Sequence, residues 1–305
     1  MSRDLVDPGE LCAGDLGELF GLARSLIADS SGFSGSLRGC EVFIAFDEDS
    51  TRTRLSFEVA ARRLGADVHH FYSRGSSMSK GETFWDTLLN ILHLGADFLV
   101  VRHSDGDFFD RFLKDFGFDT HVISGGHGSR HHPTQGLLDV FVMSRCSRNV
   151  ADLSVLIVGD VVHSRVARSQ IKILKMLGCS DIRVVGPEVF LPDPSEDILF
   201  DSVSFSTSLT ENISDVDVVS LLRIQRERIF NQDLVDWDDY VNLYRFDKDH
   251  ADNLKSGAIV IHPQPMNRNV EISDEVLDLP CCKIFEQVEL GVYIRMACLL
   301  WLQQR

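Results

Sequence analysis

EVFIAF, residues 41–46, is followed after a short polar loop by TRTRLSFEVAARRL, residues 51–64, and these two segments indicate the fold. The first is a short apolar run, which predicts a strand. The second carries Leu55, Val59, Ala60 and Leu64 at helical spacing, and Gly65 suits a helix end. A strand that leads directly into a helix is the repeating unit of α/β proteins.

The same rhythm recurs along the chain. Further strands are predicted at 98–101, 121–124, 154–159, 182–186, 217–222 and 258–262, and further helices after Gly81, at about 133–143, at 166–177 and at 287–305. The fold class is therefore α/β, with largely parallel, doubly wound sheets. The length of 305 residues suggests two domains, and the polar stretch SRCSRN, residues 144–149, marks the expected boundary. We expect one domain over 1–143 and a second over 144–286.

Composition limits the possible functions. The hydrophobic fraction is 44%, mean hydropathy is -0.01, and no apolar run has the roughly 18 residues of a membrane span. The start of the chain lacks the pattern of a secretory signal, and the seven cysteines contain no C-x-x-C pair, which predicts reduced thiols in the cytoplasm and no zinc site. Forty-six acids against 30 bases disfavour nucleic-acid binding, so an anionic ligand would need cations gathered locally.

The first candidate site is STRTR, residues 50–54, between the first strand and its helix. Unpaired N–H groups at a helix start, the hydroxyls of Ser50, Thr51 and Thr53, and the guanidinium of Arg52 together suit phosphate. The local pattern alone also fits an ordinary capped helix with surface arginines. No P-loop and no G-x-G-x-x-G dinucleotide fingerprint occurs in the chain.

Other polar segments also begin helices or follow strands. RGSSMSKGET, residues 74–83, places Lys80 on a Gly/Ser-rich loop that could close over an anion, or be a solvated turn. HHPTQ, residues 131–135, places His132 before a proline that can open a helix, where an imidazole can donate to a carbonyl oxygen. Arg102, Arg165 and Arg223 each follow a predicted strand, at the edge where open α/β sheets bind ligands.

These motifs together resemble one family. STRTRLSFE, SKGET, VRH, HPTQ, HSRVARS, LLRIQRER and HPQPMNRNVEI occur in the order and spacing of the carbamoyltransferases, from about residue 35 to the C-terminus. STRTR with HPTQ is typical of the whole group. HPQP with MNRNVEI, SKGET and RIQRER resembles the aspartate enzymes rather than the ornithine enzymes, in which H-C-L-P is expected.

The resemblance implies a reaction: the amine of L-aspartate attacks carbamoyl phosphate and gives N-carbamoyl-L-aspartate and phosphate, an early step of pyrimidine biosynthesis, with no metal or cofactor. It also implies that the C-terminal helix, 287–305, completes the first domain, and that the chain is a cytoplasmic homotrimer with shared sites, with regulatory chains or other pathway enzymes as possible partners. The implied roles are as follows: Ser50, Thr51, Arg52 and Thr53 hold the phosphate; Arg102 bridges phosphate and carbonyl oxygen; His132 and Thr53 stabilise that oxygen; Gln135 and the backbone of Pro263, Gln264 and Pro265 bind the carbamoyl NH2; Arg165 binds the α-carboxylate; Arg223, Gln225 and Lys80 bind the β-carboxylate; and Ser76 and Lys80 enter a neighbouring subunit's site.

Some positions depart from the family pattern. Asp49 replaces the usual proline before STRTR, and a carboxylate there would repel phosphate unless it points away or pairs with an arginine. Glu289 and Leu290 stand where Thr-Asn is common. Three alternatives stay open: a carbamoyltransferase with another amine acceptor, an inactive paralogue that serves as a binding subunit, and a dinucleotide-dependent oxidoreductase without the glycine fingerprint.

Overall fold

The first strand and helix form as their sequence predicts. In the computed structural model, β1 (Glu41–Phe46) is followed by α2 (Thr51–Arg63), and the side chains of Val42, Ile44 and Ala45 are fully buried. The structure describes residues 4–73, 76–114, 116–146, 149–225 and 236–305. The chain divides into two compact units, one of residues 1–134 with 289–305 and one of residues 135–288. The proposed domain boundary at 143 remains a prediction.

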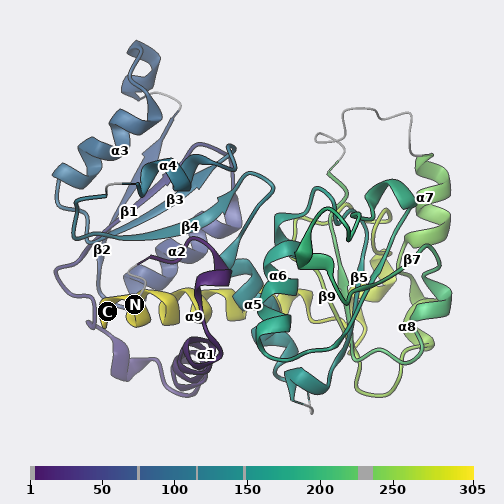
Figure 1. Ribbon diagram of the computed structural model, residues 1–305. Helices are drawn as coiled ribbons and strands as arrows, with labels where there is room; N and C mark the ends of the chain where they lie inside the picture. The colour runs from purple at the N-terminus through teal and green to yellow at the C-terminus, as the bar shows by residue number, and fades with distance from the viewer. Residues whose placement is uncertain (1–3, 74–75, 115, 147–148, 226–235) are drawn as a thin grey trace. The chain divides into compact units, whose positions relative to one another are not determined.

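The first unit contains a parallel sheet of four strands in the order β2-β1-β3-β4 (Figure 1). Besides β1 and α2, its elements are α1 (Ala13–Ala28), β2 (Asp67–Tyr72), α3 (Phe84–His93), β3 (Phe98–His103), α4 (Phe108–Phe112), β4 (His121–His127) and the start of α5 (Pro133–Met143). Because β2 and β3 pair with opposite edges of β1, the direction of winding reverses between β1 and β3. In such sheets this reversal is where ligands bind, outside the carboxyl ends of the strands.

The second unit contains a parallel sheet of five strands in the order β7-β6-β5-β8-β9. Its elements are the rest of α5, β5 (Ser154–Val158), α6 (Arg165–Met176), β6 (Asp181–Val185), β7 (Ser204–Ser206), β8 (Val218–Leu221), α7 (Trp237–Tyr244), α8 (Lys248–Asp252), β9 (Ile259–Ile261) and the start of α9 (Ile284–Gln303). Here the winding reverses between β5 and β8. The predicted class, α/β with two doubly wound parallel sheets, is confirmed.

The C-terminal helix belongs to the first unit, as expected. Figure 1 shows the yellow α9 beside the purple α1, and Trp301 Nε1 donates to Glu18 Oε2 on α1 at 3.1 Å. The guanidinium of Arg295 lies over the ring of Phe57 on α2, 5.3 Å from its centre. These contacts bury the terminal helix among segments more than 200 residues earlier in the chain.

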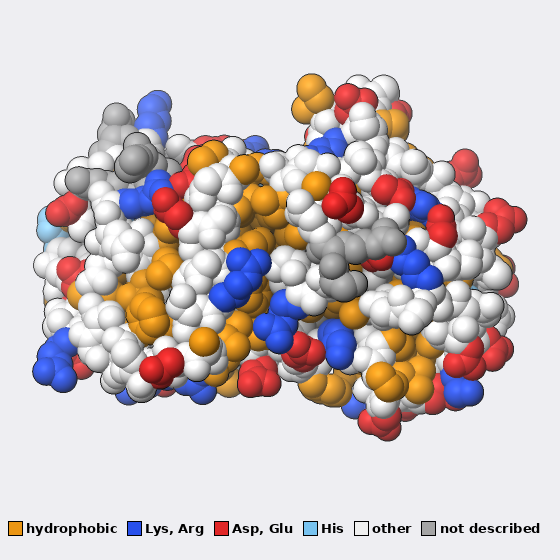
Figure 2. All heavy atoms as spheres, turned by 90° about the horizontal axis from the view of Figure 1, so that it is seen from below, with side chains coloured by type: hydrophobic (Ala, Val, Ile, Leu, Met, Phe, Trp, Pro, Cys, Tyr) orange, Lys and Arg blue, Asp and Glu red, His pale blue; other side chains and the backbone are white. Residues whose placement is uncertain are grey.

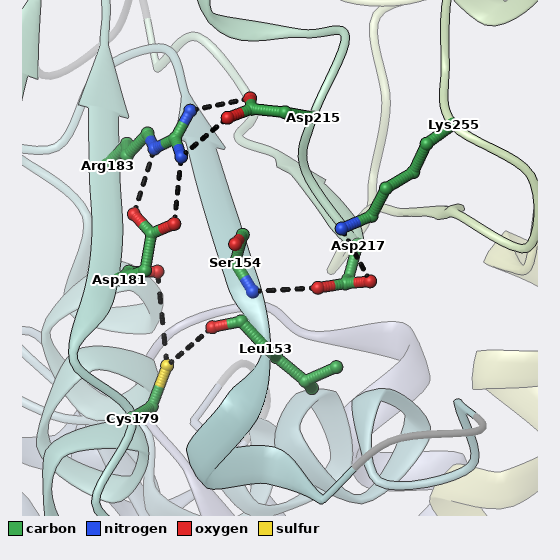
Figure 3. A network of polar contacts seen from close by, with 8 residues as sticks. All are labelled: Leu153, Ser154, Cys179, Asp181, Arg183, Asp215, Asp217 and Lys255. Atoms are coloured by element: carbon green, nitrogen blue, oxygen red, sulfur yellow. Dashed lines mark hydrogen bonds and ion pairs between the residues drawn. The ribbon is translucent and has the colours of Figure 1, made fainter.

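The amino edge of the second sheet is held by a polar network, drawn in Figure 3. The guanidinium of Arg183 on β6 pairs with Asp181 at 2.8 Å and with Asp215 at 2.7 Å. Its hydrogen bonds lower the pKa of both carboxyl groups. Asp217 accepts from the backbone N–H of Ser154 at 2.9 Å and pairs with Lys255 at 2.8 Å. This network lies at the edge of the sheet opposite the carboxyl ends of the strands and is therefore a scaffold.

Candidate active site

The predicted anion seat of the first unit lies at the carboxyl end of β1. Ser50 is the N-cap residue of α2, with extended backbone (φ -155°, ψ 102°), and its side chain makes no capping hydrogen bond. Ser50 thus stands directly before the predicted helix, but its hydroxyl does not cap the helix. The first N–H groups of α2 and the hydroxyls of Ser50 and Thr51 therefore remain suited to an anion.

Thr53 and His132 come together from segments 79 residues apart. Thr53 Oγ1 lies 3.4 Å from His132 Nε2, and both side chains are about 5% exposed. The phosphate-seat motif and the HPTQ motif thus share one buried polar contact. A hydroxyl and an imidazole placed side by side can both donate to one oxygen atom that carries developing negative charge.

Arg102 lies at the carboxyl end of β3, next to the end of β1 in the sheet. Its Nη1 donates to Gly125 O at 3.0 Å, and its Nε lies 3.2 Å from Glu48 Oε2. The acid that pairs with this arginine is therefore Glu48, one residue before the unusual Asp49, whose side chain is exposed. Glu48 was not singled out from the sequence, although it lies between the strand and the anion seat.

Ser76 and Lys80 lie on the 3-10 turn Ser77–Lys80 and its cap. Ser76 Oγ accepts from Met78 N at 3.3 Å and donates to Ser73 O at 2.8 Å, while Lys80 is exposed. In the described part of the first unit, Lys80 makes no hydrogen bond or ion pair with Arg52 or His132.

In the second unit, Arg165 and Gln225 lie on adjoining segments. Arg165 is the first residue of α6 and is only 6% exposed, and Ser164 caps the helix by accepting from Ala167 N at 3.1 Å. Gln225, four residues beyond β8, donates from Nε2 to His163 O at 3.3 Å. The two segments follow β5 and β8, the strands between which the winding reverses.

The segment that carries Arg223 and Gln225 is fixed by a buried acid. Glu271, 2% exposed, accepts from Ile224 N at 2.8 Å, from Asn267 N at 2.7 Å and from Asn267 Nδ2 at 2.8 Å. Burial raises the pKa of the Glu271 carboxyl, although these donors favour its charged form. The MNRNVEI motif therefore holds the RIQ motif in place.

Gln135 is held by an acid one helical turn later. Its Nε2 donates to Asp139 Oδ1 at 2.7 Å, and both side chains are buried. The turn at 263–265 is braced by His262, whose Nδ1 accepts from Gln264 N at 2.8 Å. Gln264 Nε2 is buried and has no hydrogen-bond partner among the described residues.

Four residues that contact predicted site residues or their supporting segments were not found from the sequence: Glu48 in the first unit, and Asp139, Glu271 and Gln287, which donates to Asp139, in the second. One of them carried a signal, because Asp139 is the only charged residue in the helix 133–143 and is flanked by apolar residues. The others act through partners far away in the chain, which no local pattern indicates.

A cavity of about 390 Å³ in the first unit does not include the predicted site residues. Its walls include Phe109, Lys114 and Arg130, and its acid Asp7 lies 3.2 Å from His131. Charges of both signs line it and pair with each other. It is therefore a polar recess beside the N-terminal segment and not part of the anion seat.

Two further features concern cofactors and membranes. Among residues 4–73, 76–114, 116–146, 149–225 and 236–305, no group of three or more His, Cys, Asp or Glu side chains is arranged to hold a metal ion. None of the helices in those ranges combines the length and the hydropathy that a membrane span requires.

Comparison with known families accounts for both units. Residues 3–145 match the aspartate/ornithine carbamoyltransferase, carbamoyl-P binding domain, and residues 151–302 match the aspartate/ornithine carbamoyltransferase, Asp/Orn binding domain. The fold and the site thus define a carbamoyltransferase. The chain belongs to the aspartate/ornithine carbamoyltransferase family.

Solved structures of aspartate transcarbamoylase from Trypanosoma cruzi are similar over nearly the whole chain. The complex with carbamoyl phosphate and aspartate is 27% identical, with a TM-score of 0.88 over 97% of this chain and 95% of that one. The complex with N-(phosphonacetyl)-L-aspartic acid is 27% identical, with a TM-score of 0.89 over 97% and 94%. The ligand-free form is 26% identical, with a TM-score of 0.86 over 97% and 94%.

Proposed function

We propose that this carbamoyltransferase transfers the carbamoyl group of carbamoyl phosphate to the amine of L-aspartate, in the cytoplasm and as an early step of pyrimidine biosynthesis. The observation that carries the proposal is the hydrogen bond from Gln225 to His163 O, because it joins the segments of Arg165 and Arg223. Two guanidinium groups and an amide suit an amine with two carboxylates. The side chain of ornithine is a cation and would need acids there.

The proposed chemistry uses positioning and electrostatics alone. The amine attacks the carbonyl carbon, the C–O bond to phosphate breaks, and the leaving phosphate takes the proton that the amine loses. Ser50, Thr51, Arg52 and Thr53 hold the phosphate. Arg102, Thr53 and His132 stabilise the carbonyl oxygen as negative charge develops on it.

The remaining groups orient the two substrates. Gln135 and the backbone of Pro263, Gln264 and Pro265 bind the carbamoyl NH2. Arg165 pairs with the α-carboxylate of aspartate, while Arg223, Gln225 and Lys80 bind its β-carboxylate. Local cations of this kind would attract two anionic substrates to a chain with a net charge of -16.

We also propose that the active form is a homotrimer in which Ser76 and Lys80 enter a neighbouring site. The exposure of Lys80 supports this assembly, and so do three exposed hydrophobic side chains on α2 and the edge strand β2. These are Leu55 at 48%, Val59 at 38% and Tyr72 at 52% exposure. A second copy of the chain would cover apolar surface there and bring in the lysine.

The test is carbamoyl transfer by the purified protein from carbamoyl phosphate to L-aspartate, with L-ornithine and no amine in parallel. Aspartate-dependent N-carbamoyl-L-aspartate is expected. Arg52→Ala should remove it and also abolish inhibition by inorganic phosphate, while the circular dichroism spectrum stays unchanged. Turnover with ornithine but not with aspartate would refute aspartate as the substrate. Unchanged phosphate inhibition in Arg52→Ala would refute the assignment of Arg52 to the phosphate.

A further inference from the structure

Asp139 is a buried acid to which three glutamine side chains donate. It lies on α5, is 0% exposed, and accepts from Gln135 Nε2 at 2.7 Å and from Gln287 Nε2 at 2.5 Å through Oδ1. Gln170 Nε2 on α6 donates to Oδ2 at 3.2 Å. The close approach of the two helices depends on Gly136, since a Cβ atom there would lie 2.8 Å from the Cβ of Ser169.

The carboxylate fixes which way each glutamine amide points. An ionised carboxylate only accepts hydrogen bonds, so a glutamine that contacts it must present its NH2 group to it. For Gln135, the Oε1 atom is then directed away from Asp139 as an acceptor. A carbamoyl NH2 is a donor and needs such acceptors.

The same acid is also linked to the backbone that begins the HPQP turn. Gln287 donates to Asp139 and accepts with its Oε1 from His262 N at 3.1 Å. If Gln287 reversed its amide, it would lose both hydrogen bonds at once. Asp139 therefore holds the residue that precedes Pro263, through one side chain.

We propose that Asp139 is a positioning residue that, through Gln135 and Gln287, orients the acceptors for the carbamoyl NH2 and so sets the preference for an acyl phosphate that bears an amide. The inference rests on the proposed function and deepens it. It assigns to Asp139 the discrimination between an NH2 and a methyl group of the same size on the acyl carbon. An analogue that cannot donate these hydrogen bonds leaves buried acceptors unpaired, and its binding is therefore strongly disfavoured.

The structure also predicts which substitution is tolerated. In Asp139→Asn, the remaining oxygen can still accept from Gln135 and Gln287 if the new NH2 faces Gln170. Gln170 can reverse its amide there, because its Oε1 has no partner among the described residues and Ser220 Oγ, now 3.0 Å from its Nε2, is a hydroxyl that can donate. Asp139→Leu removes both acceptor atoms. Asp139→Asn should therefore keep the orientation of Gln135 and Gln287 that Asp139→Leu loses.

The experiment measures binding by calorimetry to the full-length protein with two stable analogues, phosphonoacetamide and 2-oxopropylphosphonate, which differ only in NH2 against CH3. Wild type should prefer the amide by at least about tenfold, since one unmade hydrogen bond to a buried group costs this much. Asp139→Leu should reduce the preference to less than about threefold, and Asp139→Asn should keep it. Affinity for inorganic phosphate should stay within about twofold in all of them, because that ligand has no acyl group.

Two further variants make the result decisive. Gln287→Met removes both hydrogen bonds with little change in volume and should also lower the preference, so the proposal remains testable if Asp139→Leu does not fold. Asp217→Asn is the matched control, a buried acid at the amino edge of the second sheet (Figure 3), and should lower stability without changing the preference.

Three outcomes would overturn the inference. The first is that folded Asp139→Leu or Gln287→Met keeps the wild-type preference for the amide analogue, and the second is that these variants lose affinity for phosphate and for the analogues equally. The third is that Asp217→Asn loses the preference. Failure of the proposed function is a separate result. In that case wild type itself would bind neither phosphonoacetamide nor phosphate.

Discussion

The Glu48 side chain is both a structural partner of Arg102 and a competitor of the ligand for the Arg102 guanidinium. The Glu48 carboxylate lies 3.2 Å from Arg102 Nε, and the two side chains are only 21% and 12% exposed. A phosphate or a carbonyl oxygen that needs this guanidinium must replace or share that carboxylate. The pair lowers the cost of a buried cation in the ligand-free molecule and opposes anion binding.

Glu48→Gln should therefore bind inorganic phosphate more tightly. We expect Kd to fall by about threefold to tenfold, since the competing partner becomes neutral and a partly buried pair has a coupling of about 1 kcal/mol. Phosphate titration monitored by calorimetry measures this change. Glu58→Gln is the control, because Glu58 lies on α2 and pairs with Arg62 and His70 rather than with the site. Weaker phosphate binding in Glu48→Gln would contradict this interpretation.

At this scale, the sequence predicts residues better than it predicts their partners. STRTR, HPTQ and the arginines after the strands are recognisable because each motif is continuous in the chain. Asp139 was not found because Gln170 and Gln287, two of its partners, lie 31 and 148 residues away. Glu271 likewise acts on Ile224, 47 residues earlier. Such contacts follow from the fold and cannot be read from spacing.

Among the strands, the interior ones and the two edge strands that another segment covers, β4 and β9, were predicted, whereas the edge strands β2 and β7 were not. The runs at 41–46, 98–101 and 154–159 are apolar and became β1, β3 and β5. DVHHFY, residues 67–72, has mostly polar or exposed side chains and became the edge strand β2. β7 has only three residues. An edge strand that no other segment covers can be short or can expose its side chains, and its sequence then carries little hydrophobic signal.

The Arg183 network makes a prediction about the stability of the second sheet. Arg183→Met should lower the free energy of unfolding by about 1 kcal/mol at pH 7, because bidentate pairs that are partly exposed stabilise only weakly. The folded pKa values of Asp181 and Asp215 lie below the usual value, so their contribution is present above about pH 4 and is lost as the pH falls through the lowered values. Urea unfolding of both proteins at pH 7, 5 and 3 measures the difference.

The difference between wild type and Arg183→Met should be constant from pH 7 to 5 and smaller at pH 3. Arg62→Met is the control, since its pair with Glu58 is 60% exposed on the arginine side and should contribute almost nothing. A difference that grows towards low pH would show that Arg183 acts through packing rather than through its two carboxylates.

At the scale of the whole molecule, the charges are mixed rather than segregated on the face that Figure 2 shows. Acidic side chains lie scattered among basic ones, so the surplus of acids does not form one continuous patch on that face. An acidic surface without a dominant patch leaves the field near a site to be set by its own cations.

The proposed shared site makes a quantitative prediction for mixed assemblies. Lys80→Ala and His132→Ala should each be nearly inactive alone. After random reassembly of equal amounts, three quarters of the trimers contain both variants, and each of these holds one native site out of three. Recovery of about a quarter of wild-type activity is therefore expected. The measurement is specific activity after denaturation and joint refolding, with separately refolded variants as the control; absence of recovery in trimers shown to be mixed would refute sharing.

The two outer edges of the first sheet differ, and this affects how the protein should be handled. Leu5 covers the edge of β4 by donating to Val122 O at 2.8 Å and accepting from Ser124 N at 2.9 Å. In the described part of the chain, no segment pairs in this way with the outer edge of β2, where Tyr72 is half exposed. An uncovered strand edge is a template for intermolecular pairing. The proposed trimer would cover this part of the surface, so subunits that have been dissociated should aggregate through β2 more readily than assembled trimers at the same protein concentration.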